Sequence, residues 1–486
     1  MILTIIKKEI LEAVQSFRFL IATLLCLFLI PLGMYVNLKE YEKRLADYQE
    51  SVRLYEERSK GNVGAFFSAE GYRPPSVLSI FSVGLEYFLP NKIVTSRDGN
   101  VRTSNEQGIN NPQSLLFGKV DLLFNVSYVI SLLALIFTFS TITGEKENGT
   151  FRLVMSNPVP RWQILVAKMA GNYLVLLVPF ALSVLVALLI LAASGTVAVF
   201  SSAVLPSILT ILLITLVFIL AMFNLGILIS SLTHRSITSI VALLFIWAVL
   251  VLSLPKISPM VAEIVYPVTS QQVLNIQKTM ARENLEKERR EKIVELYESL
   301  APQFGVDPNT SFYPGRTENE KRLFALNDSL KQTIEGEYEQ RINMALGRLD
   351  EEHRNCQNTQ TSIAMNLSRI SPASCYAYII SEISATGTLE ADKIRENTER
   401  YQAEVKENLY DKYIKKEVIT RNGWASGGDY VRGFDPRTAP TPELKYRHAN
   451  LDEALKTEWT DIVLLLLFNI VFFALSYVSF LRYDVR

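Results

Sequence analysis

The sequence has 486 residues, and 49% of them are hydrophobic although 20% are charged. That combination predicts two kinds of segment in one chain, membrane-spanning and solvated. The 49 Lys and Arg residues balance the 49 Asp and Glu residues, which excludes a uniformly basic surface of the kind that binds nucleic acid.

The first apolar run covers residues 17–36 and follows the basic residues Lys7 and Lys8. Its core is longer than that of a signal peptide, and the residues after it show no small-residue cleavage pattern. We therefore expect an uncleaved membrane anchor.

Five further apolar runs have the length that a helix needs to cross the hydrocarbon layer, about 20 residues. We therefore expect an all-α polytopic membrane protein with six transmembrane helices and a large, mainly helical extracytoplasmic domain. The six predicted spans are 17–36, 121–143, 169–194, 206–231, 237–254 and 459–481.

The short loops predict the orientation, because basic residues favour the cytoplasmic side. The loop at 195–205 carries no charge, whereas the loop at 144–168 carries Lys146, Arg152, Arg161 and Lys168. Both termini and the basic loop are therefore expected in the cytoplasm, with the chain in the plasma (inner) membrane. The remaining expected segments are cytoplasmic at 1–16 and 482–486, and extracytoplasmic at 37–120 and 255–458.

Apolar residues three and four positions apart predict that a helix leaves the first span with one apolar seam. Charged helices expected near 273–300, 317–352 and 391–416 are its candidate partners, and packing within the chain is favoured over docking of another protein. Residues 61–118 and 423–442 are rich in Gly, Pro, Asn and Ser and predict loops or small irregular structure. The seam residues are Leu38, Tyr41, Leu45, Tyr48, Val52 and Tyr55.

The deeper polar residues of the predicted spans are Asn172, Asn224 and Asn469, and no charged residue occupies a predicted bilayer centre. This weighs against an ion-coupled pump. The asparagines are candidates for contacts between helices, the simpler interpretation, or for a transport path. Cys356 and Cys375 are candidates for a disulfide, but two free thiols are equally compatible with the sequence.

The most specific pattern is the start of the 144–168 loop, Gly-Glu-Lys-Glu-Asn-Gly-Thr. Phe151, Leu153 and Val154 can form a short amphipathic helix on the membrane surface, and Pro158 suits the first turn of a second helix that continues into the third span. A stiff, charged element of this kind can transmit force from a cytoplasmic motor. An ordinary polar turn that ends at Gly149 is the alternative.

This loop resembles the acidic Gly-Thr signature of permease subunits of ATP-binding-cassette exporters of the second type. Lys146 departs from the pattern, because Arg is commoner there. The resemblance covers most of the chain, with a weaker match in the outer domain. The residues that carry it are Gly144, Glu145, Glu147, Gly149, Thr150, Ser156, Asn157, Pro158, Arg161 and Lys168, together with the segments 73–76, 117–121 and 371–388.

The resemblance implies that the loop carries a coupling helix that docks on a separate ATPase subunit. It also implies that residues 1–16 form an amphipathic helix at the membrane surface, although a basic leader that only sets the topology explains them equally well. The implied ATPase-coupling interface consists of Glu145, Lys146, Glu147, Gly149, Thr150, Arg152, Asn157, Pro158 and Arg161.

No stretch of the sequence fits the phosphate-binding pattern GxxxxGK followed by Ser or Thr, so ATP and Mg are expected in the partner subunit. The three histidines are far apart, and neither HExxH nor GxSxG occurs. We expect no catalytic, cofactor-binding or metal site in this chain. The expected partners are cytoplasmic ATPase subunits, a second permease copy or a homologue, the lipid bilayer and an extracytoplasmic protein, but not nucleic acid.

These patterns favour the permease subunit of an exporter, driven through the loop between the second and third spans. The apolar spans suit a hydrophobic or amphipathic cargo. One alternative is an ATP-driven machine that transmits force to an extracytoplasmic partner and moves no solute, and the large outer domain motivates it. Another is a membrane receptor or sensor.

Overall fold

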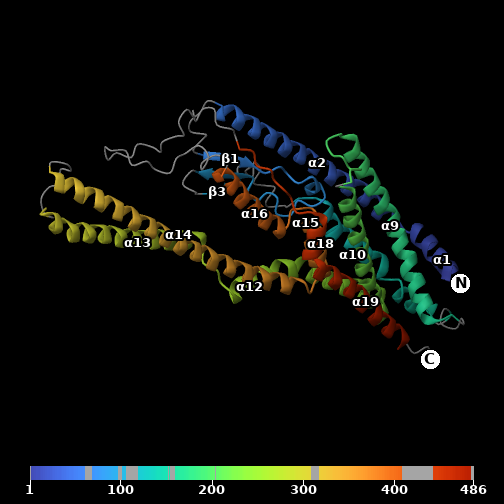
Figure 1. Cartoon of the computed structure of the whole chain (residues 1–486). Coiled ribbons are helices and arrows are strands. Elements are labelled where there is room, and N and C mark those ends of the chain that lie inside the picture. The colour runs from blue at the N-terminus through green and yellow to red at the C-terminus, as the bar shows by residue number, and fades with distance from the viewer. Residues whose placement is uncertain are drawn as a thin grey trace. The chain divides into compact units, whose positions relative to one another are not determined.

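Figure 1 shows the computed structural model of the chain, in which two compact units are distinguished. The first unit consists of Met1–Leu254 and Arg369–Arg486, and the second of Pro255–Ser368. The predicted extracytoplasmic segment 255–458 is thus divided between the two units. The residues that the structure describes are 2–60, 68–96, 101–105, 119–151, 153, 159–202, 204–307, 317–407 and 442–482.

Six helical segments of the described chain are long and apolar enough to cross a membrane, in agreement with the prediction of an all-α protein with six membrane helices. Four are single helices: α2 (Phe17–Ser59), α9 (Arg161–Ala193), α10 (Leu205–Leu232) and α19 (Trp459–Leu481). The second span consists of α5 (Leu122–Phe124), η2 (Asn125–Ile130), α6 (Ser131–Thr138) and α7 (Thr143–Glu147). The fifth consists of α11 (Ser236–Trp247), η3 (Ala248–Ser253) and α12 (Leu254–Val265).

Helix α10 is the central helix of the first unit. It packs against α6 and α19, and Phe218, Met222 and Phe223 are completely buried. A helix that is apolar on all sides is expected in such an interior position. A Cβ atom at Gly226 would overlap the Thr138 side chain of α6, so a glycine is needed for this close approach between the two helices.

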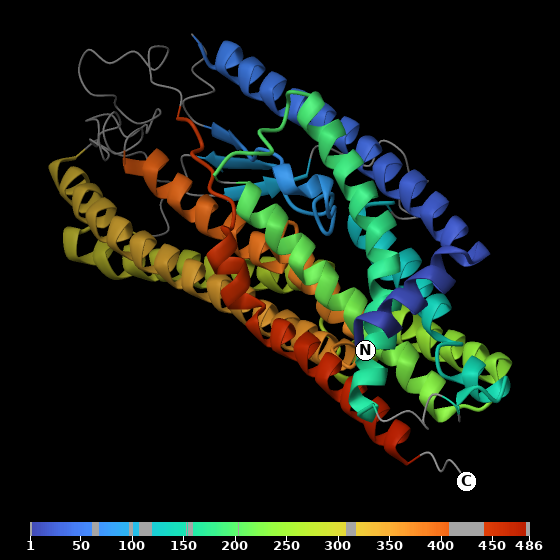
Figure 2. The same cartoon turned by 90° about the vertical axis from the view of Figure 1, so that its right-hand side faces the viewer.

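Helix α1 (Ile2–Val14) ends just before α2, and both pack along α9 (Figure 2). Ser16 separates the two helices, because its hydroxyl accepts a hydrogen bond from the backbone N–H of Phe19 at 3.4 Å and so caps the start of α2. A helix is therefore present where the sequence suggested an amphipathic segment at residues 1–16.

The predicted apolar seam lies on the second half of α2 and is buried within the chain. Leu38, Tyr41 and Tyr55 are buried, and the other seam residues are half-buried. Their neighbours in the first unit are η1 (Val77–Ile80) and β1 (Ser68–Tyr72), which the sequence did not identify as partners.

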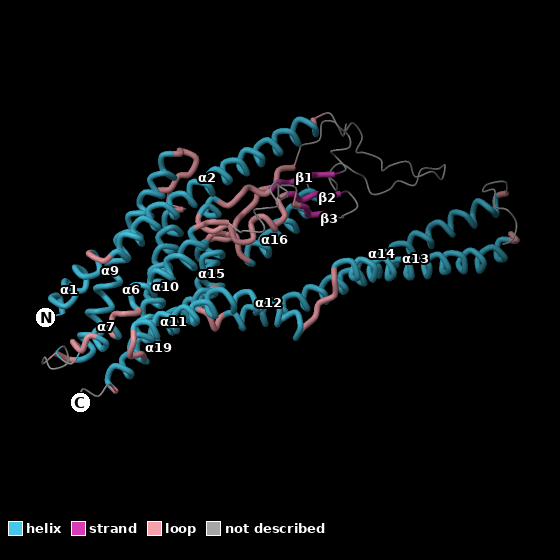
Figure 3. Tube along the Cα trace, turned by 180° about the vertical axis from the view of Figure 1, so that it is seen from behind, coloured by secondary structure: helices cyan, strands magenta, loops and turns pink. Residues whose placement is uncertain are grey.

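A small antiparallel sheet occupies part of the region predicted to be loop. Strands β1, β2 (Lys92–Ser96) and β3 (Val101–Ser104) pair in the order β1-β2-β3, with Glu70 opposite Val94 and Val94 opposite Arg102 (Figure 3). The strands are short, and β1 contains no β-branched residue, so they give little sequence signal.

Buried charges connect this region to the C-terminal part of the first unit. Glu86 is 1% exposed and lies 3.1 Å from the guanidinium groups of both Arg44 on α2 and Arg73. Glu390, on α16 (Thr388–Val405), is fully buried and bonds His448 at 2.7 Å. Arg73 approaches Glu390 to 3.9 Å, so one network joins α2 to α16.

Helix α15 (Pro372–Ile383) packs against α10 and α19, and α18 (Leu451–Thr457) leads into α19. Tyr376 stacks on Phe218 with 4.6 Å between the ring centroids, and its hydroxyl lies 3.0 Å from that of Thr215. Arg369 donates hydrogen bonds to both carboxylate oxygens of Asp461, at 3.0 and 2.7 Å. Aromatic stacking and a bidentate ion pair therefore fix α15 against two spans.

The second unit is mainly a helical hairpin of α13 (Gln271–Leu300) and α14 (Glu318–Ser368), with η4 (Ala301–Phe304) after α13 (Figure 3). Lys278 pairs with Asp350 at 2.5 Å, and Arg341 with Glu288 at 3.1 Å. The residue that lies later in α13 pairs with the residue that lies earlier in α14, so the two helices are antiparallel. Both helices were predicted, and α14 continues further than expected.

Candidate functional site

Helix α7 and the start of α9 frame the 144–168 loop, at the same end of the first unit as α1 and the end of α19 (Figure 3). Helix α7 ends at Asn148, and Gly149 follows with φ +74°, a left-handed conformation that glycine adopts readily. Helix α9 begins at Arg161. The predicted site residues Arg152, Asn157 and Pro158 lie outside the described residues.

Glu145 belongs to a buried cluster of charges. The Nζ atom of Lys168, a residue 3% exposed, lies 2.6 Å from Oε1 of Glu145 and 2.8 Å from Oε1 of Glu9 on α1. Asn172 adds a 3.4 Å hydrogen bond to the other oxygen of Glu9. The cluster thus ties α1, α7 and α9 together through one cation. It also carries one more negative charge than positive charge, because two carboxylates share a single lysine.

Lys146 and Glu147 connect the same loop to the fourth and fifth spans. Lys146 donates to the backbone carbonyls of Ser231 and Thr233, the latter at 3.1 Å, at the end of α10. Glu147 accepts a 3.1 Å hydrogen bond from the backbone N–H of Ser236, the first residue of α11. A carboxylate in this position satisfies a free N–H at a helix start and stabilises the helix dipole.

Arg161 and Phe151 connect the loop to the sixth span. The guanidinium of Arg161 donates to the carbonyl of Leu481 at 2.7 Å, where the last carbonyls of α19 have no partner within the helix. Phe151 is 1% exposed and packs edge-to-face on Phe480 at 5.5 Å. Phe151 and Phe480 belong to a small apolar cluster that also contains Ile142, Ile164, Leu165 and Ile227.

A polar hollow of about 660 Å³ lies beside the charge cluster. Residues of α1, α7, α9 and the start of α11 line it, among them Glu145, Thr150 and Lys168. Thr150 is exposed, whereas the Oε2 atom of Glu145 is buried and has no hydrogen-bond partner among the described residues. A buried carboxylate oxygen without a donor is a strong acceptor for a donor supplied by another molecule.

The three predicted asparagines lie in two places. Asn172 belongs to the charge cluster described above. Asn224 donates to the side-chain oxygen of Asn469 at 3.0 Å, and Asn469 donates to the carbonyl of Val217 at 3.1 Å. These bonds join α10 to α19 inside the bundle, and the side-chain oxygen of Asn224 is buried without a hydrogen-bond partner among the described residues.

The candidate disulfide between Cys356 and Cys375 is not formed in the structure, where both residues are free thiols. Cys356 lies in the second unit and Cys375 in the first. Each thiol has its own contact: Cys375 donates to the carbonyl of Arg369 at 3.6 Å, and Cys356 accepts from the hydroxyl of Tyr266 at 3.8 Å.

The sequence did not identify Glu9 as a site residue. Its only signal was its position among charged residues of an amphipathic pattern, which does not distinguish a buried carboxylate from the exposed Glu12. Its position in the structure depends on the packing of α1 on α9, where Gly171 leaves space beside the Cβ atom of Glu9.

Comparison with known proteins gives one result for the whole chain. A family model described as "ABC-2 family transporter protein" matches residues 3–485. No curated relative matches the chain. The family match extends over both units and includes every element of the loop site.

Proposed function

Because this chain belongs to the ABC-2 transporter family, we propose that it is the permease subunit of an exporter whose ATPase is a separate cytoplasmic protein. ATP and Mg would bind in that partner. The observation that carries the proposal is the set of contacts made by the 144–168 loop, which reach five different helices of the permease.

The coupling site of this proposal consists of Glu145, Lys146, Glu147 and Arg161, with Gly149 and Thr150 at the exposed turn. Each of the four charged residues contacts a different part of the bundle. A rigid-body displacement of the loop would therefore act on α1, α9, α10, α11 and α19 together. The ATPase can drive such a change only by binding the two positions of the loop with different affinity.

The polar hollow beside the charge cluster supports docking of the ATPase at this end. Its lining combines the exposed Thr150 with the carboxylate of Glu145, whose second oxygen lacks a hydrogen-bond partner among described residues. We infer that a donor side chain of the ATPase, such as an arginine or lysine, donates a hydrogen bond to this second oxygen of Glu145. Arg152, Asn157 and Pro158 remain part of the proposed interface on sequence grounds alone.

The proposed orientation has both termini and the loop in the cytoplasm, with the chain in the plasma membrane. The basic residues of the 144–168 loop and the uncharged 195–205 loop support it. Two permeases, identical or homologous, would assemble with two ATPase subunits. Cargo would then cross between the permeases, and the few polar groups in the spans suit a hydrophobic or amphipathic compound.

A second candidate function is force transmission to an extracytoplasmic partner without solute movement. It is favoured by α2, which continues as one helix of 43 residues from the first span to Ser59. The buried pair of Arg44 and Glu86 fixes the far part of this helix to the rest of the first unit. Transport into sealed vesicles distinguishes the two functions, because a force transmitter would hydrolyse ATP with no movement of solute.

Site-specific photo-crosslinking tests the coupling site. A photoreactive amino acid at the exposed Thr150 is expected to crosslink, in intact cells, to a protein with the GxxxxGK phosphate-binding pattern followed by Ser or Thr. Thr196 is a matched control, because it is the same residue type, is exposed and lies in the loop between α9 and α10. Crosslinking of such an ATPase from Thr196 but not from Thr150 would contradict the proposal.

A further inference from the structure

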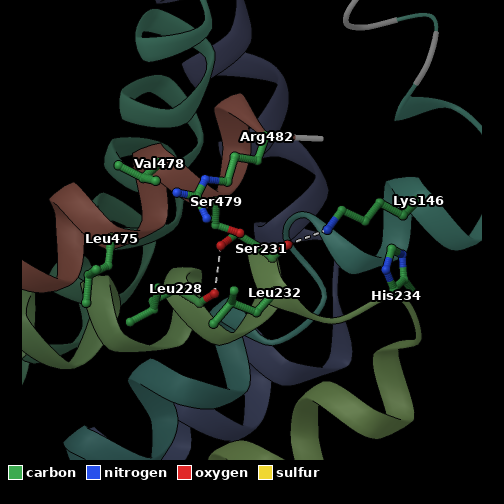
Figure 4. A pocket seen from close by; sticks show the side chains of 9 residues that line it. All are labelled: Lys146, Leu228, Ser231, Leu232, His234, Leu475, Val478, Ser479 and Arg482. Atoms are coloured by element: carbon green, nitrogen blue, oxygen red, sulfur yellow. Dashed lines mark hydrogen bonds between the residues drawn. The ribbon is translucent and has the colours of Figure 1, made fainter. Parts of the chain in front are cut away.

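A second pocket, of about 690 Å³, lies between the ends of α10 and α19 (Figure 4). Three basic side chains line it: Lys146 from α7, His234 from the α10–α11 turn and Arg482 from the end of α19. Figure 4 shows Lys146 and His234 on one side of Ser231 and Arg482 on the other. The pocket is thus bordered by basic groups from three separate parts of the chain.

The charge of the lining is one-sided. Among the described residues that line the pocket there is no Asp or Glu, and the only other polar side chains are the hydroxyls of Ser231 and Ser479. The hydrogen bonds from Lys146 to the carbonyls of Ser231 and Thr233 fix its ammonium group at the pocket wall (Figure 4). An anion is the ligand that such a lining favours.

The remaining wall is apolar and belongs to two membrane-spanning helices. Leu232 at the end of α10 is 58% exposed, and Leu475 and Val478 on α19 are 51% and 42% exposed. The apolar faces of spans 4 and 6 therefore meet the basic groups at the level where each span ends. A soluble anion would use only the basic groups, whereas a lipid would use both parts of the lining.

We propose that this pocket binds the phosphate headgroup of an anionic membrane lipid, with its acyl chain along Leu475 and Val478. Basic pockets between transmembrane helices at the cytoplasmic surface are favourable sites for such headgroups. The assignment of the site to the cytoplasmic leaflet rests on the orientation in the proposed function, whereas the pocket and its lining do not depend on that orientation. The lipid would contact Lys146, which is also a residue of the coupling site, so lipid binding would affect that site.

The test uses the purified full chain in nanodiscs of phosphatidylcholine that contain a trace of phosphatidylglycerol with a photoreactive acyl chain. Mass spectrometry locates the crosslinks. We expect preferential labelling of 228–232 and 475–482 by phosphatidylglycerol, compared with photoreactive phosphatidylcholine at the same trace level. Both leaflets contain the same lipids and no ATPase is present, so the result does not depend on orientation or on coupling.

The key variant is Arg482→Gln, which removes one charge from the lining. The preference for phosphatidylglycerol should fall about five-fold, equivalent to about 1 kcal/mol. Arg482→Lys should retain most of the preference, which shows that a loss in Arg482→Gln is not caused by misfolding. Arg235→Gln is the matched control, because Arg235 is exposed and adjacent to His234 but does not line the pocket.

Three outcomes would overturn the proposal. One is equal labelling by phosphatidylglycerol and phosphatidylcholine. Another is an equal loss of preference in Arg482→Gln and Arg235→Gln. The third comes from a competition arm with inorganic phosphate: protection of the pocket by free phosphate, without any preference between the two lipids, would assign the site to a soluble anion.

Discussion

The Nζ atom of Lys168 lies 2.6 Å from Oε1 of Glu145, so an ion pair closes the 144–168 loop at its base. Lys168 also bonds Glu9 and is almost completely buried. Buried charges are stable only with their partners, because each has lost its hydration. The loop, the first helix and the third span therefore depend on one another.

Removing the central cation should be far more damaging than removing one of its partners. Lys168→Met leaves the buried Glu9 and the partly buried Glu145 without a cation, and we expect a loss of about 3–5 kcal/mol in the free energy of unfolding. Glu145→Gln leaves the pair of Lys168 and Glu9 intact, so we expect about 1–2 kcal/mol. Equilibrium unfolding in mixed micelles measures both.

Lys8→Met is the control for these variants, since Lys8 and Glu12 form a pair that is more than half exposed. Its effect should stay below about 0.5 kcal/mol. Equal losses in Lys168→Met and Lys8→Met would show that the buried cluster is not a structural link.

Arg161 is expected to matter for coupling more than for stability. Its bond to the carbonyl of Leu481 is exposed, so Arg161→Gln should change the free energy of unfolding by less than about 1 kcal/mol. If the loop moves α19 through this bond, the effect of the permease on ATP hydrolysis by its partner should fall several-fold in nanodiscs. Arg161→Lys keeps a positively charged donor, whereas the amide of Gln is a neutral and shorter donor, so Arg161→Lys should retain part of the effect. Unchanged hydrolysis in Arg161→Gln would remove this residue from the coupling path.

Asn224 and Asn469 should behave as a bond between helices. A double-mutant cycle with Asn224→Leu and Asn469→Leu should give a coupling energy of about 0.6 kcal/mol, the average for such bonds in membranes. Asn469→Leu also removes the hydrogen bonds of Asn469 to Val217 and Leu465, so it should cost more than Asn224→Leu, which removes only the bond between the two asparagines. Loss of transport with no coupling energy would favour the path interpretation instead.

Cysteine labelling tests the orientation. In a chain with Cys356 replaced by Ser, a membrane-impermeant maleimide should label Thr150→Cys only after lysis and Thr196→Cys in intact cells. Both positions are exposed, so access to the reagent depends on the side of the membrane. Labelling of Thr150→Cys from outside would invert the topology, and the coupling proposal would be withdrawn with it.

The spans could be predicted from the sequence because apolar length alone specifies a membrane helix. The loop site could be predicted only in part. The sequence indicated Glu145, Glu147 and Arg161, but their contacts with Lys168, Ser236 and Leu481 join distant segments, and no local pattern encodes them. The same reason applies to Arg369 and Asp461, two charges that form a bidentate pair across 92 positions.

The small sheet and the buried pair of Arg44 and Glu86 were not predicted for a different reason. Arg44 lies on α2 next to the apolar seam, at a position that the helical spacing predicts to be exposed. It is buried because η1 and the turn after it bring the carboxylate of Glu86 close to its guanidinium. Neither composition nor periodicity contains that information.

Glu458, which immediately precedes α19, should make stability depend on pH. Burial raises the pKa of its carboxyl to about 8, and the nearby carboxylates of Asp461 and Glu382 contribute, although Arg369 opposes them. In the unfolded chain the pKa is about 4.3. The folded state therefore holds a proton that the unfolded state releases, so the free energy of unfolding should fall as pH rises from about 4.3 to about 8 and then level off.

Glu458→Gln keeps a neutral group at this position, and it should equal the wild type in stability at acidic pH but be more stable above the folded pKa. Thermal unfolding followed across this range measures the difference, with Glu399→Gln as the control because Glu399 is exposed. Parallel pH profiles for the wild type and Glu458→Gln would show that another group is responsible.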